Sequence, residues 1–356
     1  MVSYVNNELY LEDIKRVSEE YDFGLLKNKS ILITGASGLI CSFLVDVLMY
    51  RNINYNDNIK IYMLCRNKDK LINRFNKYEL EELSENNTSN LIYIIQDICN
   101  EFKFDVNFDY IINAASNTHP KQYSSDPVGT ITTNIIGLNN LLKYCINHKP
   151  KRVLELSSVE IYGSNRGDTD KFKEDYLGYI DCNTARAGYP EGKRLCEALC
   201  QSYISQFDLD IVIGRLCRIY GPTMLNDDSK ALAQFIRNAV NGEDIVLKSE
   251  GTQYFSYLYM VDAVTAMLTI LFNGIKGEAY NISYDKSDIT LRDLASLLAK
   301  TNNKEVVFEL PDEKERKGYS TANRAILDST KLLALGWKPY YDIENGVNRT
   351  VKILKK

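Results

Sequence analysis

Short apolar runs alternate with amphipathic segments of helix length through the first two thirds of the chain. The runs lie at 30–34, 59–64, 91–95, 110–115, 152–157 and 210–215. Strands of a parallel sheet are buried on both faces and are joined by crossover helices, which produces this alternation. The pattern therefore predicts an α/β fold with a parallel sheet.

The pattern differs on either side of this region. Residues 8–22 have apolar positions at helical spacing, which predicts an amphipathic helix ahead of the main fold. After residue 222, helical patterns at 229–241 and 291–301 mix with short strands, and we expect a strand near 254–259 to return to the main sheet. The polar segment 72–90 is expected to be partly loop.

Composition narrows the classes of partner. The chain has 356 residues, 45% of them hydrophobic, and a net charge of −4, which suits a large core and gives no basic patch for nucleic acid. No apolar run approaches the ~20 residues that cross a bilayer, and the N-terminus lacks the layout of a signal peptide. The eight cysteines form no CxxC pair, so we expect reduced thiols, no metal and a cytoplasmic protein.

A glycine pair follows the first apolar run, in "ILITGASGLICSFLVDVL" (31–48). Gly35 permits a tight turn, and Gly38 lets backbone N–H groups approach a pyrophosphate at the start of a helix. Cys41 stands where a third glycine would allow close packing of helix on strand. We therefore expect a dinucleotide at this loop, bound by Gly35, Ser37, Gly38, Leu39 and Ile40; an ordinary βα turn is the simpler alternative.

The next strand ends in "MLCRNKDK", with Arg66 at its tip. An acidic residue at this place would bind a ribose 2′-hydroxyl, whereas an arginine suits a 2′-phosphate. Arg66 would also fit stacking on adenine or exposure to solvent. The choice between NAD and NADP stays open.

A tyrosine and a lysine are spaced four residues apart in "TARAGYPEGKRLCEALCQSY" (184–203). The spacing places Tyr189 and Lys193 on one helix face, and a nearby ammonium favours the phenolate form of a tyrosine whose ordinary pKa is about 10. Ser158, at the end of the strand in "LELSSVEIYG" (154–163), would hydrogen-bond a substrate hydroxyl beside Tyr189. We expect Tyr189 to act as a base that Lys193 favours and that Ser158 assists.

The order of these elements resembles the extended short-chain dehydrogenase/reductases, in particular the NAD(P)-dependent nucleotide-sugar epimerases and dehydratases. The resemblance covers residues 30 to about 350. It rests on "TGASGLI", "IINAAS", "TTNIIGLNNLL", "SSVEIYG", "YPEGK", "GRLCRIYGP", "YFSYLYMVDAV" and "LDSTKLLALGWKP". Within the family the chain is most similar to the UDP-glucuronate decarboxylases.

The resemblance implies a fold and a division of the chain. The fold would be a Rossmann-type doubly wound parallel sheet with a smaller C-terminal α/β substrate-binding lobe. The expected parts are a helical extension at 1–29, a dinucleotide-binding domain at 30–215 with a return segment near 252–282, and a substrate lobe formed by 216–251 and 283–356. Relatives commonly dimerise through a four-helix bundle, and Leu195, Leu199 and Tyr203 would supply that face here.

The resemblance also assigns roles. Tyr189 would take the proton of a sugar hydroxyl, Lys193 would hold the ribose and lower the pKa of the tyrosine, and Ser158 would complete the hydroxyl clamp. The remaining residues expected at the cofactor are Asp97, Ile98, Asn113, Ala114, Ala115 and Asn134. The substrate would be a nucleotide sugar.

The implied reaction starts with oxidation at C4 of the sugar. The 4-keto intermediate then leads to an epimer, to loss of water from C5 and C6, or to loss of a C6 carboxylate as carbon dioxide, with the cofactor recycled. Glu160 matches an acidic position of dehydratases and decarboxylases, while Val159 lacks the aspartate of many dehydratases. Arg186 would supply a cation for a substrate carboxylate, although a surface arginine fits equally.

Two positions depart from the family pattern at the expected diphosphate site. Arg218 replaces an asparagine and Phe255 replaces an arginine. Arg218 therefore either substitutes for the missing charge, indicates an unusual substrate, or forms a salt bridge between the lobes. Further substrate contacts are expected from Ser116, His119, Tyr123 and Arg324.

Two alternatives remain besides the decarboxylase or 4,6-dehydratase and the C4 epimerase. Arg66 motivates an NADPH-dependent carbonyl reductase. A non-catalytic, dinucleotide-sensing scaffold would use the same fold, but it would have no need of Ser158, Tyr189 and Lys193 together.

Overall fold

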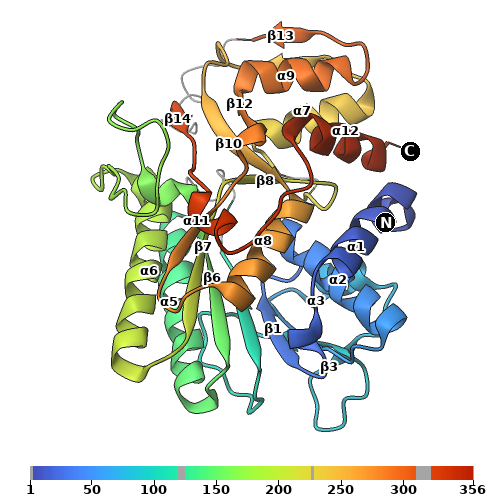
Figure 1. Cartoon of the computed structure of the whole chain (residues 1–356), viewed down its shortest axis with the longest axis vertical. Coiled ribbons are helices and arrows are strands. Elements are labelled where there is room, and N and C mark those ends of the chain that lie inside the picture. Colours follow the sequence, from blue (N-terminus) through green and yellow to red (C-terminus); the bar gives the residue numbers. More distant parts are fainter. Residues whose placement is uncertain (1–2, 117, 119–124, 226–227, 310–321, 356) are drawn as a thin grey trace.

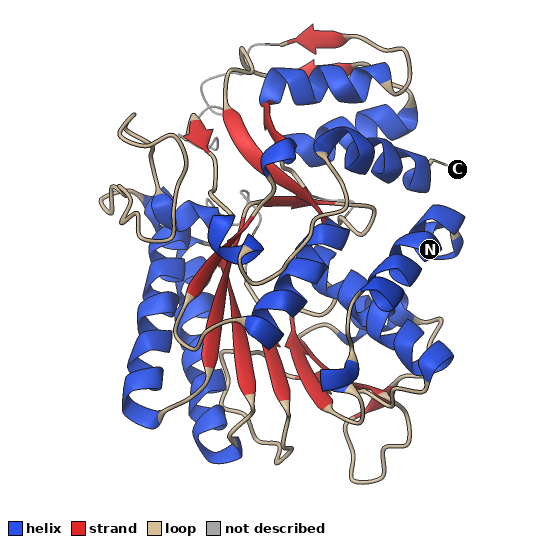
Figure 2. Cartoon of the chain, viewed as in Figure 1, coloured by secondary structure: helices blue, strands red, loops and turns tan. Residues whose placement is uncertain are grey.

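The computed structural model describes residues 3–116, 118, 125–225, 228–309 and 322–355. One large sheet carries the first part of the chain, in the order β11-β7-β6-β5-β1-β2-β4-β3, with every neighbouring pair parallel (Figures 1 and 2). Its strands are β1 Ser30–Thr34, β2 Lys60–Cys65, β3 Glu81–Glu82, β4 Leu91–Ile95, β5 Tyr110–Asn113, β6 Arg152–Ser158, β7 Ile211–Leu216 and β11 Ala279–Ile282. The predicted Rossmann-type parallel α/β fold is confirmed.

Helices cover both faces of this sheet (Figure 1). α5 (Pro127–His148) and α6 (Gly188–Phe207) pack on one face, and α2 (Leu39–Tyr55) and α8 (Met260–Asn273) pack on the other. α3 (Lys68–Phe75) follows β2. Short 3₁₀ helices complete this part: η1 Ser3–Asn6, η2 Gly24–Leu26, η3 Val159–Tyr162 and η4 Ala185–Ala187.

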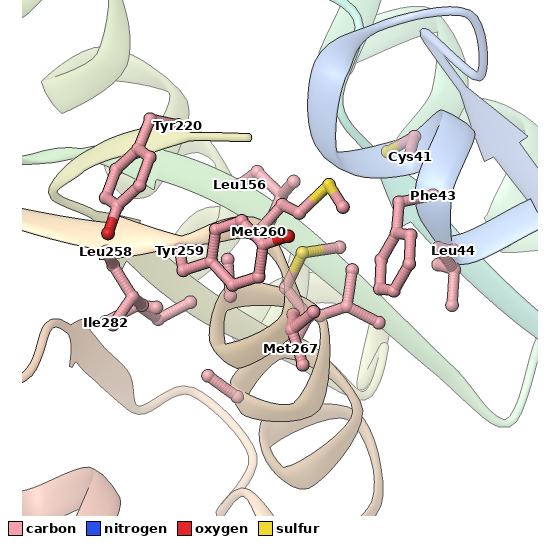
Figure 3. Packing of buried hydrophobic residues seen from close by; sticks show 14 of the residues in the cluster. Cys41, Phe43, Leu44, Leu156, Tyr220, Leu258, Tyr259, Met260, Met267 and Ile282 are labelled. Atoms are coloured by element: carbon pink, nitrogen blue, oxygen red, sulfur yellow. The ribbon is translucent and has the colours of Figure 1, made fainter. Parts of the chain in front are cut away.

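The core between α2 and α8 is tightly filled. Figure 3 shows Cys41, Phe43 and Leu44 of α2 near Met260 and Met267 of α8, all almost fully buried. α8 is apolar around nearly its whole circumference, as expected for a helix enclosed by protein. The flexible methionines fill irregular space between the two helices.

A smaller lobe lies beyond the carboxyl ends of the large sheet's strands (Figure 1). Its sheet pairs β10 (Tyr254–Tyr259) with β12 (Asp288–Thr290), β14 (Arg324–Ala325) and β8 (Arg218–Tyr220), and a second sheet pairs β9 (Ile245–Leu247) with β13 (Val306–Phe308). The helices are α7 Ala231–Asn241, η5 Asp285–Ser287, α9 Leu291–Lys300, α11 Thr330–Leu333 and α12 Ile343–Leu354.

The expectation that the strand at 254–259 returns to the large sheet is wrong. β7 continues through Cys217 into β8, and β8 pairs with β10 beyond the end of the large sheet. The chain returns instead through β11, which pairs in parallel with β7. The apolar pattern identified the strand at 254–259, but its pairing depends on where the chain leaves the large sheet after β7.

The predicted N-terminal helix is present as α1 (Glu8–Glu20) and is anchored to both parts of the molecule. Tyr10 donates to the buried carboxylate of Asp46 on α2. Asp13 is fully buried and accepts from Tyr259 of β10 at 2.6 Å, from Tyr341 at 2.8 Å and from Arg349 Nε of α12 at 2.7 Å. α1 therefore bridges the large sheet's helices and the smaller lobe.

Candidate active site

The turn after β1 forms a cradle for an anion. Gly35 has φ +66°, and a Cβ there would lie 2.9 Å from the carbonyl oxygen of Ala114. Gly38 N donates to Gly35 O at 2.9 Å, and α2 begins at the next residue. Among the described residues, no side chain caps this helix start, so its first N–H groups remain available to a phosphate. A dinucleotide pyrophosphate fits this turn.

Cys41 occupies the third position of the glycine pattern, on the side of α2 that faces the core. Cys41 is buried in the core between α2 and α8. Burial raises the pKa of its thiol to about 12, so it stays neutral. Leu39 and Ile40 are partly buried beside it, and Leu39 O accepts from Thr223 Oγ1 at 2.7 Å.

The tip of β2 carries a paired arginine. Arg66 Nη1 lies 3.7 Å from Asp97 Oδ2, which follows β4, and both side chains are partly exposed. The neighbouring Ile98 is buried and packs against Gly137 of α5. The pairing places a carboxylate as well as a cation at the expected adenosine end of the cleft.

The ends of β1, β5 and β6 are joined by buried hydrogen bonds. Thr34 Oγ1 donates to Asn113 Oδ1 at 2.7 Å and accepts from Ala114 N and Ala115 N. Asn134 on α5 donates to Thr130 O and accepts from Ser116 Oγ at 2.8 Å. Asn113 and Asn134 thus act on neighbouring protein groups in this structure, holding the backbone at 113–116 in place.

Ser158, Tyr189 and Lys193 meet at the end of β6, as their spacing predicted. Tyr189 and Lys193 are both buried, one helical turn apart near the start of α6. Ser158 and Tyr189 share a hydrogen bond. Lys193 Nζ donates to Leu156 O at 2.7 Å, so β6 holds in place the ammonium that acts on Tyr189.

The groups around Tyr189 shift its pKa in opposite directions. Burial raises the pKa of Tyr189 above its ordinary value, while the Lys193 ammonium and the hydrogen bond with Ser158 act to lower that pKa. Glu160 raises it and Arg186 lowers it by smaller amounts. The protein alone therefore leaves Tyr189 protonated at neutral pH.

Glu155 is a residue of this site that we had not singled out from the sequence. It is fully buried on β6, its Oε1 lies 3.4 Å from Lys193 Nζ, and its Oε2 accepts from Asn113 Nδ2 at 2.6 Å. An acidic residue inside the apolar run "RVLELS" is the signal that identifies it.

Glu160 and Arg186 form an ion pair beside the tyrosine. Arg186 Nη2 donates to Glu160 Oε2 at 2.9 Å, and about a quarter to a third of each side chain remains exposed. Both charges act on Tyr189. The structure therefore brings a carboxylate and a guanidinium together beside Tyr189.

The residues expected to contact the substrate lie on different elements of the structure. Arg218 stacks on Phe255, its guanidinium carbon 3.6 Å from the ring centroid, because β8 and β10 are paired. Arg324 on β14 lies 3.6 Å from Asp170 and over the ring of Tyr254. His119 and Tyr123 lie outside the described residues.

A doubly wound sheet with a glycine turn after its first strand and a Ser–Tyr–Lys set at the end of a central strand defines a dinucleotide-dependent enzyme of the short-chain dehydrogenase/reductase class. The sequence profile described as "NAD dependent epimerase/dehydratase family" matches residues 31–283. The chain belongs to this family.

Individual relatives agree with this placement. The chain is 27% identical over 334 residues to UDP-glucuronic acid decarboxylase 1 of Danio rerio, covering 92% of this chain and 73% of the relative. It is 29% identical over 325 residues to UDP-glucuronic acid decarboxylase 5 of Arabidopsis thaliana, covering 90% and 87%. The crystal structure of UDP-glucose 4-epimerase from Thermotoga maritima superposes with a TM-score of 0.75 at 22% identity, over 91% of this chain and 98% of that one, which shows the shared fold.

Proposed function

We propose that this protein converts a nucleotide sugar through a 4-keto intermediate and recycles its cofactor within each turnover, with decarboxylation or 4,6-dehydration as the outcome. The observation that carries the proposal is the Glu160–Arg186 ion pair next to Ser158, Tyr189 and Lys193. The sequence similarity to UDP-glucuronic acid decarboxylases supports a nucleotide sugar as the substrate. C4 epimerisation is the alternative outcome, since it needs the same tyrosine and lysine.

Each side chain of the site is assigned one role in the proposed reaction. Ser158 donates to or accepts from the C4 hydroxyl, and Tyr189 removes the proton of that hydroxyl. Glu160 exchanges the proton at C5, which the neighbouring ketone acidifies. Arg186 binds a C6 carboxylate in a decarboxylase, where its present partner Glu160 gives way to the substrate's charge.

The cofactor expected in the cleft is NAD, which supplies the acceptor for the C4 hydrogen and returns it later in the cycle. Gly35, Ser37, Gly38, Leu39 and Ile40 would hold the pyrophosphate, and Asp97 and Ile98 would lie near the adenine. Asp97 partly neutralises Arg66 at 3.7 Å, which disfavours the extra phosphate of NADP. An NADPH-dependent carbonyl reductase is the alternative if Arg66 turns away from Asp97.

The sugar nucleotide is proposed to lie between the dinucleotide-binding domain, 30–215, and the lobe formed by 216–251 and 283–356. Arg218 is the proposed diphosphate contact, because stacking on Phe255 leaves its guanidinium edge for hydrogen bonds and its Nη1 is buried without a partner among the described residues. Ser116 and Arg324 are further candidate contacts, as are His119 and Tyr123.

We also propose that the protein is cytoplasmic and forms a homodimer. The proposed dimer interface is formed by exposed apolar residues of α5 and α6. Val128, Ile131 and Ile136 of α5 and Leu195 of α6 are exposed, and solvent-facing side chains of this kind suit helix packing between two copies. Leu199 is partly buried and Tyr203 is buried, where it donates to Asn139 Oδ1, so only Leu195 of the three residues expected at this face is available. No helix within the described residues is both long and apolar enough to span a membrane.

The proposal is tested with NAD and a panel of UDP-glucuronate, dTDP-glucose and UDP-glucose, each product being identified by mass. Loss of carbon dioxide indicates a decarboxylase, loss of water a dehydratase, and an isomer of unchanged mass an epimerase. Tyr189→Phe is expected to lower turnover about 100-fold or more while retaining NAD binding. A panel without any turnover, on protein shown to bind NAD, would count against an enzyme and favour the dinucleotide-sensing scaffold.

A further inference from the structure

Glu155 carries a charge where the fold places apolar groups. On β6 the residues before it, Val153 and Leu154, and the residue after it, Leu156, are buried in the core. Removing a carboxylate from water costs several kcal/mol unless partners offset the loss. An apolar side chain would fill this position without that cost, so the charge needs a reason beyond packing.

The partners of Glu155 connect two parts of the site. Oε2 accepts from Asn113, whose other amide atom accepts from Thr34 immediately before the glycine turn. Oε1 faces the ammonium of Lys193 at 3.4 Å. A buried chain of polar groups thus runs from the end of β1 through β5 and β6 to the lysine on α6, with the carboxylate fixed in orientation at its centre.

The other charged groups near Lys193 are already balanced. Glu197, one turn further along α6, is paired with Arg215 of β7 at 2.7 Å and accepts from Ser157 of β6. The thiols of Cys196 and Cys200 stay neutral, because burial raises the pKa of each. Across Tyr189, Glu160 is paired with Arg186. This leaves Glu155 as the counter-charge of Lys193.

We infer that Glu155 is a positioning residue that holds the Lys193 ammonium and offsets its charge, so that the phenol of Tyr189 keeps its proton until the cofactor is bound and acts as a strong base once it has ionised. The inference rests on the proposed function, because it assigns Tyr189 the role of the base. Burial raises the pKa of Glu155, and Lys193 and Asn113 oppose that rise. Burial alone would lower the pKa of Lys193, but Glu155, Tyr189 and Cys196 together raise that pKa above its ordinary value.

The test measures the pKa of Tyr189 directly by carbon-13 NMR of the tyrosine Cζ, assigning the signal as the one that disappears in Tyr189→Phe. The titration is run with and without NAD and needs no sugar nucleotide. Glu155→Gln keeps the shape and removes the charge, so the pKa of Tyr189 is expected to fall by about one unit. The acidic limb of the pH profile of kcat/KM should move down by the same amount.

Two variants separate this role from a purely structural one. Glu155→Met also removes the charge and keeps an unbranched side chain in an apolar setting, so it should give the same fall in pKa and serves if the glutamine variant does not fold. Glu174→Gln removes a partly buried carboxylate that accepts from the backbone of Asn281, and should leave the pKa of Tyr189 unchanged.

An unchanged or higher pKa of Tyr189 in both charge-removing variants would overturn the inference, even if their stability falls. If no sugar nucleotide of the panel is converted but the pKa of Tyr189 falls as expected, the proposed reaction is refuted. The charge balance between Glu155 and Lys193 is then still supported. The two failures are therefore distinguishable.

Discussion

Asp13 on α1 offers the sharpest test of how the N-terminal helix supports the fold. Its carboxylate receives three short hydrogen bonds, from Tyr259, Tyr341 and Arg349, in segments far along the chain. Asp13→Asn removes the charge opposite Arg349 and turns an amide N–H₂ toward donors. Removing one member of a buried ion pair typically costs about 3–5 kcal/mol.

That cost translates into a measurable shift in melting temperature. With an unfolding entropy of about 2.1 cal/mol/K per residue, the 356 residues give about 0.75 kcal/mol per degree. A loss of about 3 kcal/mol therefore lowers the midpoint by about 4 °C. Fluorescence of Trp337, the single tryptophan and a buried one, follows unfolding.

Glu12→Ala is the matched control, since Glu12 meets the same Arg349 at 2.9 Å but is largely exposed. An exposed pair contributes about 0–1 kcal/mol, so its midpoint should move by about a degree or less. Equal shifts in the two variants, or a shift below one degree for Asp13→Asn, would refute the view that the buried carboxylate joins the two parts.

Three further predictions concern the cofactor, pH and assembly. Gly35→Ala brings a Cβ within 2.9 Å of Ala114 O at φ +66° and should weaken NAD binding about 100-fold, measured by calorimetry. Burial raises the pKa of Asp262 to about 7; since the unfolded pKa is about 3.9, this group stabilises the fold fully below pH ~4 and loses that contribution as the pH rises to ~7. The stability advantage of the wild type over Asp262→Asn should therefore shrink by about 2–3 kcal/mol between pH ~5 and ~7 in urea titrations. Leu195→Lys should convert the proposed dimer to a monomer by light scattering.

Each of these has a control or a contrary outcome. Gly167 also has a positive φ, but a Cβ there meets nothing within 4 Å, so Gly167→Ala should leave NAD affinity unchanged. An equal stability difference at both pH values would exclude Asp262 as the titrating group. Leu177, in the loop before α6, is 83% exposed, and Leu177→Lys should remain dimeric; a wild-type monomer would end the proposal.

The local pattern of apolar residues was sufficient to predict most strands of the large sheet. The strands expected at 30–34 and 91–95 have those same bounds as β1 and β4, because continuous apolar runs between turn residues can be read without distant contacts. The meeting of Ser158, Tyr189 and Lys193 was also predictable, since the ends of parallel strands and the helices that follow them share one edge of a sheet.

Pairings between distant segments were not predictable in the same way. The contact of Glu155 with Lys193 depends on how α6 is rotated over β6, and the stacking of Arg218 on Phe255 depends on the register of β8 with β10. Tyr203 was expected at an outer face and is instead buried. Amphipathic spacing identifies a helix face but does not tell which neighbour covers it.

The passage of β7 through Cys217 into β8 makes one extended segment a shared member of both sheets. α1 joins the same two parts of the molecule through hydrogen bonds of Tyr10 and Asp13. Two separate connections, one along the backbone and one through side chains, restrain rotation of the smaller lobe against the large sheet. We therefore expect the proposed sugar nucleotide to enter by local displacement of surface segments rather than by rotation of the whole smaller lobe.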